Sequence, residues 1–155
     1  MPHDGGTMPG SLLSPDLLAL AGTAAETVAR LRDDGITALR AHVTEDGKVS
    51  AALIDRHQFA AHSLSWLATY AESLIQLHAW AARLSEQGRL GETEALILQI
   101  GFGEYLAQMK GGIPMSQGET ARLSDLGLTF PDCTACTTLI AAGTDTAAKL
   151  RLAEF

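Results

Sequence analysis

The chain has 155 residues, 46% of them hydrophobic and 5% aromatic, with a formal net charge of −7 at pH 7. This length suits one domain with a core of its own. The acidic balance argues against nucleic-acid binding, because the 11 basic residues are scattered rather than clustered. No apolar run approaches the roughly 20 residues of a membrane helix, and no secretory signal begins the chain. We therefore expect a soluble, cytoplasmic protein.

Alanine and leucine dominate over the β-branched residues, a mixture that favours helices over sheets. We predict an all-α fold, a bundle of about four to five helices with one long central helix. The mean hydropathy of +0.11 is high for a small domain. Either some apolar surface faces a partner, or small alanine side chains pack closely, and both readings stay open.

The first elements can be assigned from glycine, proline and capping residues. Residues 1–13 are rich in Gly and Pro and are predicted to form a flexible tail, followed by a single helical domain over residues 14–155. Ser14-Pro15-Asp16 is a typical helix start, and the first helix is expected to reach about His42. Asp33-Asp34-Gly35 is its weak point, where we expect a kink or break.

The second predicted helix is the longest. The Asp-Gly turn within Thr44–Lys48 precedes it, and no Pro or Gly interrupts the chain from about Ala51 to Gln87. A helix of roughly 35 residues would be about 50 Å long. Two adjacent apolar stripes run along it, so we expect it to contact more than one neighbour as the central helix of the bundle. Gly88 supplies its end.

A third helix is predicted from about Glu92 to Met109, with Gly101 and Gly103 inside it. Each internal glycine costs on the order of 1 kcal/mol relative to alanine. Their presence indicates the close approach of another backbone or a local loosening of the helix. Glycines that are merely tolerated are the plainer alternative.

Shorter elements follow, each marked by glycine, proline or a capping side chain. They are a Gly/Pro turn at residues 111–115, a short turn at residues 124–127, and helices at about 130–142 and 144–152. The pattern stops at Phe155 without a closing cap. We therefore expect the chain to be part of a larger protein.

Cys133 and Cys136 have the C-x-x-C spacing of redox disulfides and zinc sites. A zinc site needs two further ligands and no second pair exists, while a thioredoxin-type site needs a βαβ context that this composition does not offer. We therefore predict two ordinary helix thiols in a reducing compartment. A thiol redox protein remains an alternative.

The histidines and one glutamate are the other candidates for chemistry. His57, His62 and His78 are separated by five and sixteen residues, whereas ligands on one helix face lie three or four apart, so no metal site is predicted. We expect His78 to be a core histidine with one partner. Glu72 is either a buried carboxylate with a raised pKa or a solvated side chain, and Gln76 is its natural partner.

No catalytic or cofactor-binding residue is predicted from the residues themselves. The chain has no G-x-S-x-G elbow and no Ser/His/Asp ordering. The stretch from Gly101 to Glu104 is not a G-x-G-x-x-G motif, and no strand is expected before it. Neither hydrolysis nor dinucleotide binding has support.

Three stretches nevertheless carry a resemblance. They are HQFAAHSLSWLATYAESL at residues 57–74, ILQIGFGEYLA at 97–107 and GGIPMSQGE at 111–119. Together they resemble the helical N-terminal extension of methylsuccinyl-CoA dehydrogenases, a branch of the acyl-CoA dehydrogenase family. The likeness covers roughly Asp16 to Leu128.

The resemblance implies a flavoenzyme that uses FAD, in which a glutamate base removes an α-proton and the β-hydride passes to the flavin. In the family the FAD pocket and this glutamate lie in an α-β-α body, and no residue of this chain matches their motifs. The chain is therefore expected to be an accessory N-terminal helical domain, not catalytic alone, that packs on a dehydrogenase body in cis or in trans.

The alternative function is a stand-alone helical module for oligomerisation or protein binding, which associates through an exposed stripe of its long helix. For the accessory domain, the Gly/Pro turn is the predicted contact region. Met115, Gln117 and Glu119 are its candidate residues, because polar side chains beside a Gly-rich backbone could meet a CoA ligand or a body-domain surface.

Overall fold

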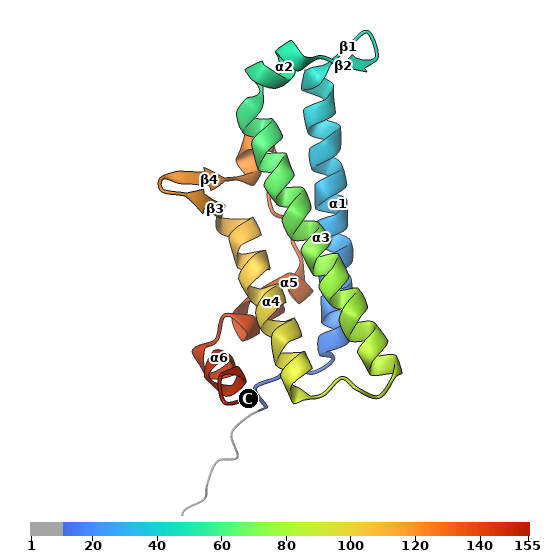
Figure 1. Ribbon diagram of the computed structural model, residues 1–155, viewed down its shortest axis with the longest axis vertical. Coiled ribbons are helices and arrows are strands. Elements are labelled where there is room, and N and C mark those ends of the chain that lie inside the picture. The colour runs from blue at the N-terminus through green and yellow to red at the C-terminus, as the bar shows by residue number, and fades with distance from the viewer. Residues whose placement is uncertain (1–10) are drawn as a thin grey trace, which may run out of the picture.

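Residues 11–155 are described by a computed structural model, and helices dominate them (Figure 1). The predicted all-α bundle is confirmed. The first ten residues of the predicted tail lie outside the described residues. The elements are α1 (Leu17–Val43), β1 (Thr44–Glu45), β2 (Lys48–Val49), α2 (Ala51–Arg56), α3 (Gln58–Glu86), α4 (Glu92–Gly111), β3 (Ile113–Ser116), β4 (Glu119–Ala121), the 3-10 helix η1 (Leu123–Leu126), α5 (Thr134–Gly143) and α6 (Thr146–Leu152).

The long helices α1 and α3 run side by side along the length of the molecule (Figure 1). Small side chains fill much of the space between these helices and their neighbours, since Ala21, Ala24, Ala71 and Ala81 are all fully buried. Small residues let helix axes approach closely, and the larger apolar residues Val28, Leu67 and Leu74 complete this part of the core. None of the helices within residues 11–155 is long and apolar enough to cross a membrane.

The predicted helix from Ala51 to Gln87 is divided at His57. There the backbone leaves the helical region, with φ −110° and ψ 27°, so that a short α2 turns into the 29-residue α3. The His57 ring stacks on His42 near the end of α1, with ring centroids 5.1 Å apart. This contact holds the junction between α2 and α3 against the end of α1. It joins residues far apart in sequence, so the local pattern could not indicate the break.

The break expected as one alternative at Asp33-Asp34-Gly35 does not occur, because α1 continues through these residues to Val43. Gly35 is buried, and a Cβ there would lie 3.0 Å from Leu64 Cδ1 on α3 and 3.4 Å from Leu126 Cδ1 on η1. The absence of a side chain at Gly35 therefore leaves space for leucine side chains of α3 and η1. The helical hydrogen bonds around it are kept.

The glycine within the third helix marks a contact between backbones, as one of the sequence readings proposed. A Cβ on Gly103 of α4 would lie 2.5 Å from the Cα of Gly143 and 2.7 Å from the carbonyl oxygen of Leu139, both on α5. Gly101 has a different role, since a Cβ there would meet Leu77 of α3 at 2.7 Å. The two glycines thus let α4 fit closely against α5 and α3.

A buried glutamine one turn before Gly103 ties three parts of the chain together. The Gln99 side chain is fully buried, and its Nε2 donates to the carbonyl oxygens of Leu12 at 2.8 Å and Ala142 at 3.4 Å. Its Oε1 accepts from the backbone N–H of Ser14 at 2.8 Å. Ser14 is therefore held by Gln99, and α1 begins after Asp16, whose φ is 54°.

The remaining boundaries agree with the expected order of elements. Asp46 and Gly47 have φ values of 51° and 75° in the turn between β1 and β2, as the Asp-Gly signature predicts. Asp145, rather than Thr144, caps α6 by accepting from the N–H of Ala147 at 3.0 Å. Arg151 of α6 donates two hydrogen bonds to Glu92 at the start of α4, which fastens the last helix to the bundle.

The contact between α4 and α5 can be tested with alanine substitutions. We expect Gly103→Ala and Gly143→Ala each to lower the free energy of unfolding by roughly 2 to 3 kcal/mol, because a Cβ would collide with backbone atoms that cannot rotate away. Thermal and urea denaturation would measure the change.

Gly111→Ala is the matched control, since Gly111 is also in α4 and a Cβ there would meet nothing within 4 Å. We expect its stability to be unchanged or slightly raised. Equal melting temperatures for Gly103→Ala and Gly111→Ala would contradict a close α4–α5 contact.

Candidate functional site

A β-hairpin projects from the side of the bundle directly after α4 and contains the Gly/Pro turn (Figure 1). Its strands pair antiparallel, with Ile113 opposite Ala121 and Pro114 opposite Thr120, and the register shifts between Pro114 and Ser116. Gly112, at the entry, has φ 118°, and a Cβ there would lie 2.5 Å from Thr120 Cγ2. Glycine is required at position 112, because other residues rarely adopt this φ and a side chain would collide with Thr120.

The base of the hairpin is fixed to the bundle by apolar burial. Ile113 and Ala121 face each other across the two strands and are both buried, as is Met109 on the last turn of α4. The tip lies outside this contact, with Gly118 at φ 83° in the turn. The hairpin is therefore an anchored arm whose exposed end faces solvent.

Asp125 of η1 connects the arm to α3. Its Oδ2 accepts from the hydroxyl of Ser63 at 2.7 Å and from the backbone N–H of Arg122 at 2.8 Å. Ser63 is buried on α3, so a charged hydrogen bond joins the helix to the segment that follows β4. Hydrogen bonds to a carboxylate are stronger than those between neutral groups.

Between the arm and the first turns of α3 lies an open groove of about 700 Å³, which we call the hairpin groove. Its lining mixes apolar side chains with both signs of charge: Gln58, Phe59, His62, Ser63, Met115, Gly118, Glu119, Thr120, Arg122 and Asp125. Phe59 is 82% exposed, the largest fraction among the exposed large apolar side chains of the described residues.

The structure brings together two of the three predicted site residues. Met115 and Glu119 line the hairpin groove, and Glu119 Oε2 accepts from the Ser116 hydroxyl at 3.2 Å. Gln117 is exposed in the turn at the tip and is not among the lining residues. Of the polar pair Gln117 and Glu119, only Glu119 therefore lines the groove.

Sequence reasoning missed the side of the groove that α3 and the segment after β4 supply. Phe59 falls on one of the two apolar stripes of the predicted long helix, but nothing in such a stripe distinguishes an exposed position from a packed one. The Ser63 hydroxyl donates to Asp125 across 62 residues of sequence, and Asp125 also accepts from the nearby N–H of Arg122. A local pattern carries no signal for such a contact.

A row of aromatic side chains continues from the groove along the boundary of α3 and α4. Trp66 donates from Nε1 to His62 Nε2 at 3.3 Å and meets Tyr70 edge-on, with ring centroids 6.5 Å apart. Tyr70 stacks on Tyr105 of α4 at 4.3 Å and donates its hydroxyl to Gln108 Oε1 at 2.7 Å. Burial, and to a lesser extent Tyr105, raises the pKa of the Tyr70 phenol, so it stays a protonated donor at neutral pH.

The hairpin groove does not fit the flavin cofactor that the resemblance implies for the complete enzyme. The pyrophosphate of FAD needs converging backbone N–H groups or basic side chains. In this groove Arg122 shares the lining with Glu119 and Asp125, whose carboxylates repel an anion. We therefore derive no flavin chemistry from these residues.

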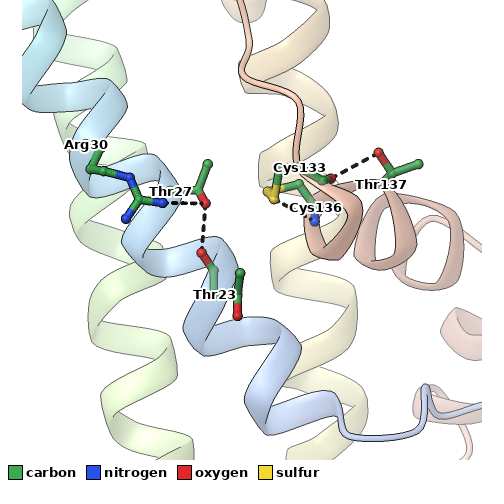
Figure 2. The surroundings of a disulfide bond; sticks show 6 residues. All are labelled: Thr23, Thr27, Arg30, Cys133, Cys136 and Thr137. Carbon is green, nitrogen blue, oxygen red and sulfur yellow. Dashed lines mark hydrogen bonds between the residues drawn. A yellow bond between two sulfur atoms is a disulfide. The ribbon is translucent and has the colours of Figure 1, made fainter.

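The prediction of two free thiols is wrong, because the structure joins Cys133 and Cys136 in a disulfide (Figure 2). Cys133 is the N-cap of α5 and has an extended backbone, which brings the two Cα atoms to 5.2 Å, within the range that a disulfide bridges. Its Sγ also accepts from the N–H of Cys136 at 3.1 Å. The exposed fractions are 9% for Cys133 and 1% for Cys136.

The disulfide lies at the start of α5, beside the part of α1 that carries Thr27 (Figure 2). Thr27 is buried, donates to the Thr23 carbonyl oxygen at 2.8 Å and accepts from Arg30 Nη2 at 3.3 Å. Disulfides are rare in a reducing cytosol. The cytoplasmic location inferred from the sequence stays a prediction.

The other candidates have ordinary structural roles. Glu72 is exposed, accepts from Gln76 Nε2 at 2.8 Å and lies 3.6 Å from Arg32 Nη1, so the solvated reading was right. His78 is half-buried rather than in the core, and its ring occupies the space beside Gly22, 3.1 Å from where a Cβ would lie. Among residues 11–155, no three His, Cys, Asp or Glu side chains are placed to hold a metal ion.

Comparison with known proteins relates the chain to a dehydrogenase of a CoA thioester. The relative is the (2S)-methylsuccinyl-CoA dehydrogenase of Cereibacter sphaeroides, which is 56% identical over 146 residues. The matched segment covers 94% of this chain and 27% of that enzyme. The resemblance to methylsuccinyl-CoA dehydrogenase is thus confirmed, and the chain spans about a quarter of the relative's length. No family model matches the chain.

The link between Asp125 and α3 can be measured with a double-mutant cycle. We expect Ser63→Ala and Asp125→Ala each to lower the free energy of unfolding, with a coupling energy of about 1.5 to 3 kcal/mol, because the hydrogen bond involves a charged group. Asp132→Ala is the control at an exposed carboxylate. Additive effects of the two substitutions would contradict the link.

The disulfide predicts a measurable loss of stability on reduction. Closing a loop of four residues should contribute about 2 kcal/mol by restricting the unfolded chain. We expect a thiol reductant to lower the melting temperature of the natural chain and to leave a Cys133→Ser/Cys136→Ser variant unchanged. Two thiols that react with a thiol reagent in the unreduced, denatured protein would show that the bond is absent.

Proposed function

We propose that the chain is an accessory helical domain of an acyl-CoA dehydrogenase-like flavoenzyme that oxidises methylsuccinyl-CoA. The similarity to (2S)-methylsuccinyl-CoA dehydrogenase carries the proposal, because 56% identity extends over almost the whole chain and matches only a part of the enzyme. The chain contributes helical surface to that enzyme. FAD and the glutamate base belong to the catalytic body, which this sequence does not include.

The physical properties of the chain support a structural rather than a catalytic role. The polar groups around the hairpin groove are largely engaged with one another, as in the Ser63–Asp125 and Ser116–Glu119 hydrogen bonds. Exposed apolar side chains beside a fixed arm suit a domain that packs against a larger body.

The alternative is a stand-alone module that associates with itself. The exposure of Phe59 favours it as well, because an apolar side chain this open is buried equally well by a second copy. Sedimentation distinguishes the two functions. A stable homodimer of the isolated chain supports self-association, whereas a monomer supports the accessory domain.

The test is a chimeric enzyme in which this chain replaces the matched segment of the Cereibacter enzyme. We expect the chimera to bind FAD and to oxidise methylsuccinyl-CoA with a kcat/KM within about tenfold of the parent, a difference of about 1.4 kcal/mol or less. A second variant lacking the segment should melt at a lower temperature and lose activity.

Two outcomes would contradict the proposal. One is a deletion variant that keeps both the melting temperature and the kcat/KM of the parent, which would mean that the segment contributes nothing. The other is oxidation of methylsuccinyl-CoA by this chain alone, because that would require a complete active site within it.

A further inference from the structure

The side chain that protrudes beside the hairpin groove is Phe59, on the first turn of α3. It is 82% exposed, although a phenylalanine has a large apolar area that water solvates poorly. Met115 lies across the groove on the arm and is half-buried. The aromatic row formed by Trp66, Tyr70 and Tyr105 extends this surface along α3 and α4.

We propose that the hairpin groove is the docking surface for the rest of the dehydrogenase polypeptide, with Phe59 as the side chain that it buries. This docking surface rests on the proposed function, and it specifies which face of the bundle contacts the partner and which side chain the contact buries. The occupant is a protein surface that offers an apolar pocket to Phe59 and polar groups to the rim.

The composition of the groove fits a protein partner better than a small ligand. Interface centres are enriched in aromatic residues, methionine and arginine, surrounded by a polar rim. Phe59, Met115 and Arg122 line the groove together with Gln58 and Glu119. A small ligand is usually enclosed in a concave, mostly apolar site, whereas Phe59 projects from an open groove.

The groove is also held in shape before any partner arrives. Asp125 links Ser63 on α3 to the backbone of Arg122 after β4, and Ile113 and Ala121 bury the base of the arm. A surface of fixed shape loses little conformational entropy when it docks. This rigidity distinguishes the arm from a loop that is exposed only because nothing constrains it.

The comparison with the Cereibacter enzyme indicates which polypeptide would occupy the hairpin groove. The chain corresponds to 27% of the Cereibacter enzyme, so a much longer polypeptide accompanies the equivalent segment there. A second copy of this chain is the competing occupant. The net charge of −7 on each copy opposes that association, although salt would screen the repulsion.

Another apolar groove, of about 660 Å³, lies at the start of α1 and is lined by Leu13, Leu18, His78 and Leu90 among others. Residues 1–10 precede it directly, and the structure does not describe them.

Leu150 is exposed and belongs to α6, which lies at the opposite end of the bundle from the start of α3, where Phe59 stands in the sequence (Figure 1). Leu150 therefore provides a control position away from the proposed surface.

The experiment compares the labelling of introduced thiols in the isolated chain and in the chimeric enzyme, without reductant so that the disulfide stays closed. We expect Phe59→Cys to react at least about tenfold more slowly with a maleimide in the chimera than in the isolated chain, because an interface core excludes water and reagent. Leu150→Cys should react equally fast in both.

Equal labelling of Phe59→Cys in the two proteins would overturn the inference, even where the chimera is active and the proposed function holds. Protection that grows with the concentration of the isolated chain would overturn it in favour of a second copy. If the chimera does not fold, a cysteine at the aligned position of the Cereibacter enzyme gives the same comparison between native and denatured states. An activity measurement on the deletion variant tests the proposed function separately.

Discussion

The bundle depends on the contact between α4 and α5, where Gly103 and Gly143 bring two backbones together. Gln99 lies one turn earlier on the same face of α4 and reaches the last turn of α5 and the segment before α1. A side chain at either glycine would push the helices apart and separate Gln99 from its partners. Apolar packing and the buried hydrogen bonds therefore rely on the same close approach.

Close packing of small residues also explains the surface of the molecule. Because alanines and glycines occupy many interior positions of α1, α3 and α4, much of the aromatic area remains outside the core. Phe59, Trp66 and Tyr70 lie on α3 in this outer layer. Close packing of small residues, one of the two explanations of the high mean hydropathy, is thus present, and some apolar area remains exposed as well.

The same helix serves the core and the hairpin groove. Leu67 and Leu74 of α3 face the interior, and Ser63 holds the carboxylate of Asp125 close to the start of the helix. The arm is fixed at its base by Ile113 and Ala121 and at its exit by Asp125. The position of Phe59 relative to Met115 is consequently set by the bundle rather than by the hairpin.

The order of the helices, the Asp-Gly turn and the end of α4 near Gly111 could be predicted from the sequence, because period, capping and glycine placement act over a few residues. The same rules failed where a distant contact decides the conformation. His42 holds the break at His57, and Leu64 and Leu126 use the space at Gly35 without interrupting α1. Hairpin strands of three and four residues are too short for composition to signal. Composition and periodicity were therefore sufficient to predict a helical bundle, and three stretches of residues were sufficient for its resemblance to a dehydrogenase segment. The tertiary structure was needed to show that Cys133 and Cys136 are bonded, because the extended backbone of Cys133 sets their Cα separation to 5.2 Å. It was also needed to show that Met115 and Glu119, without Gln117, line a groove with Phe59, because that groove forms between the arm and α3, which lie far apart in the chain.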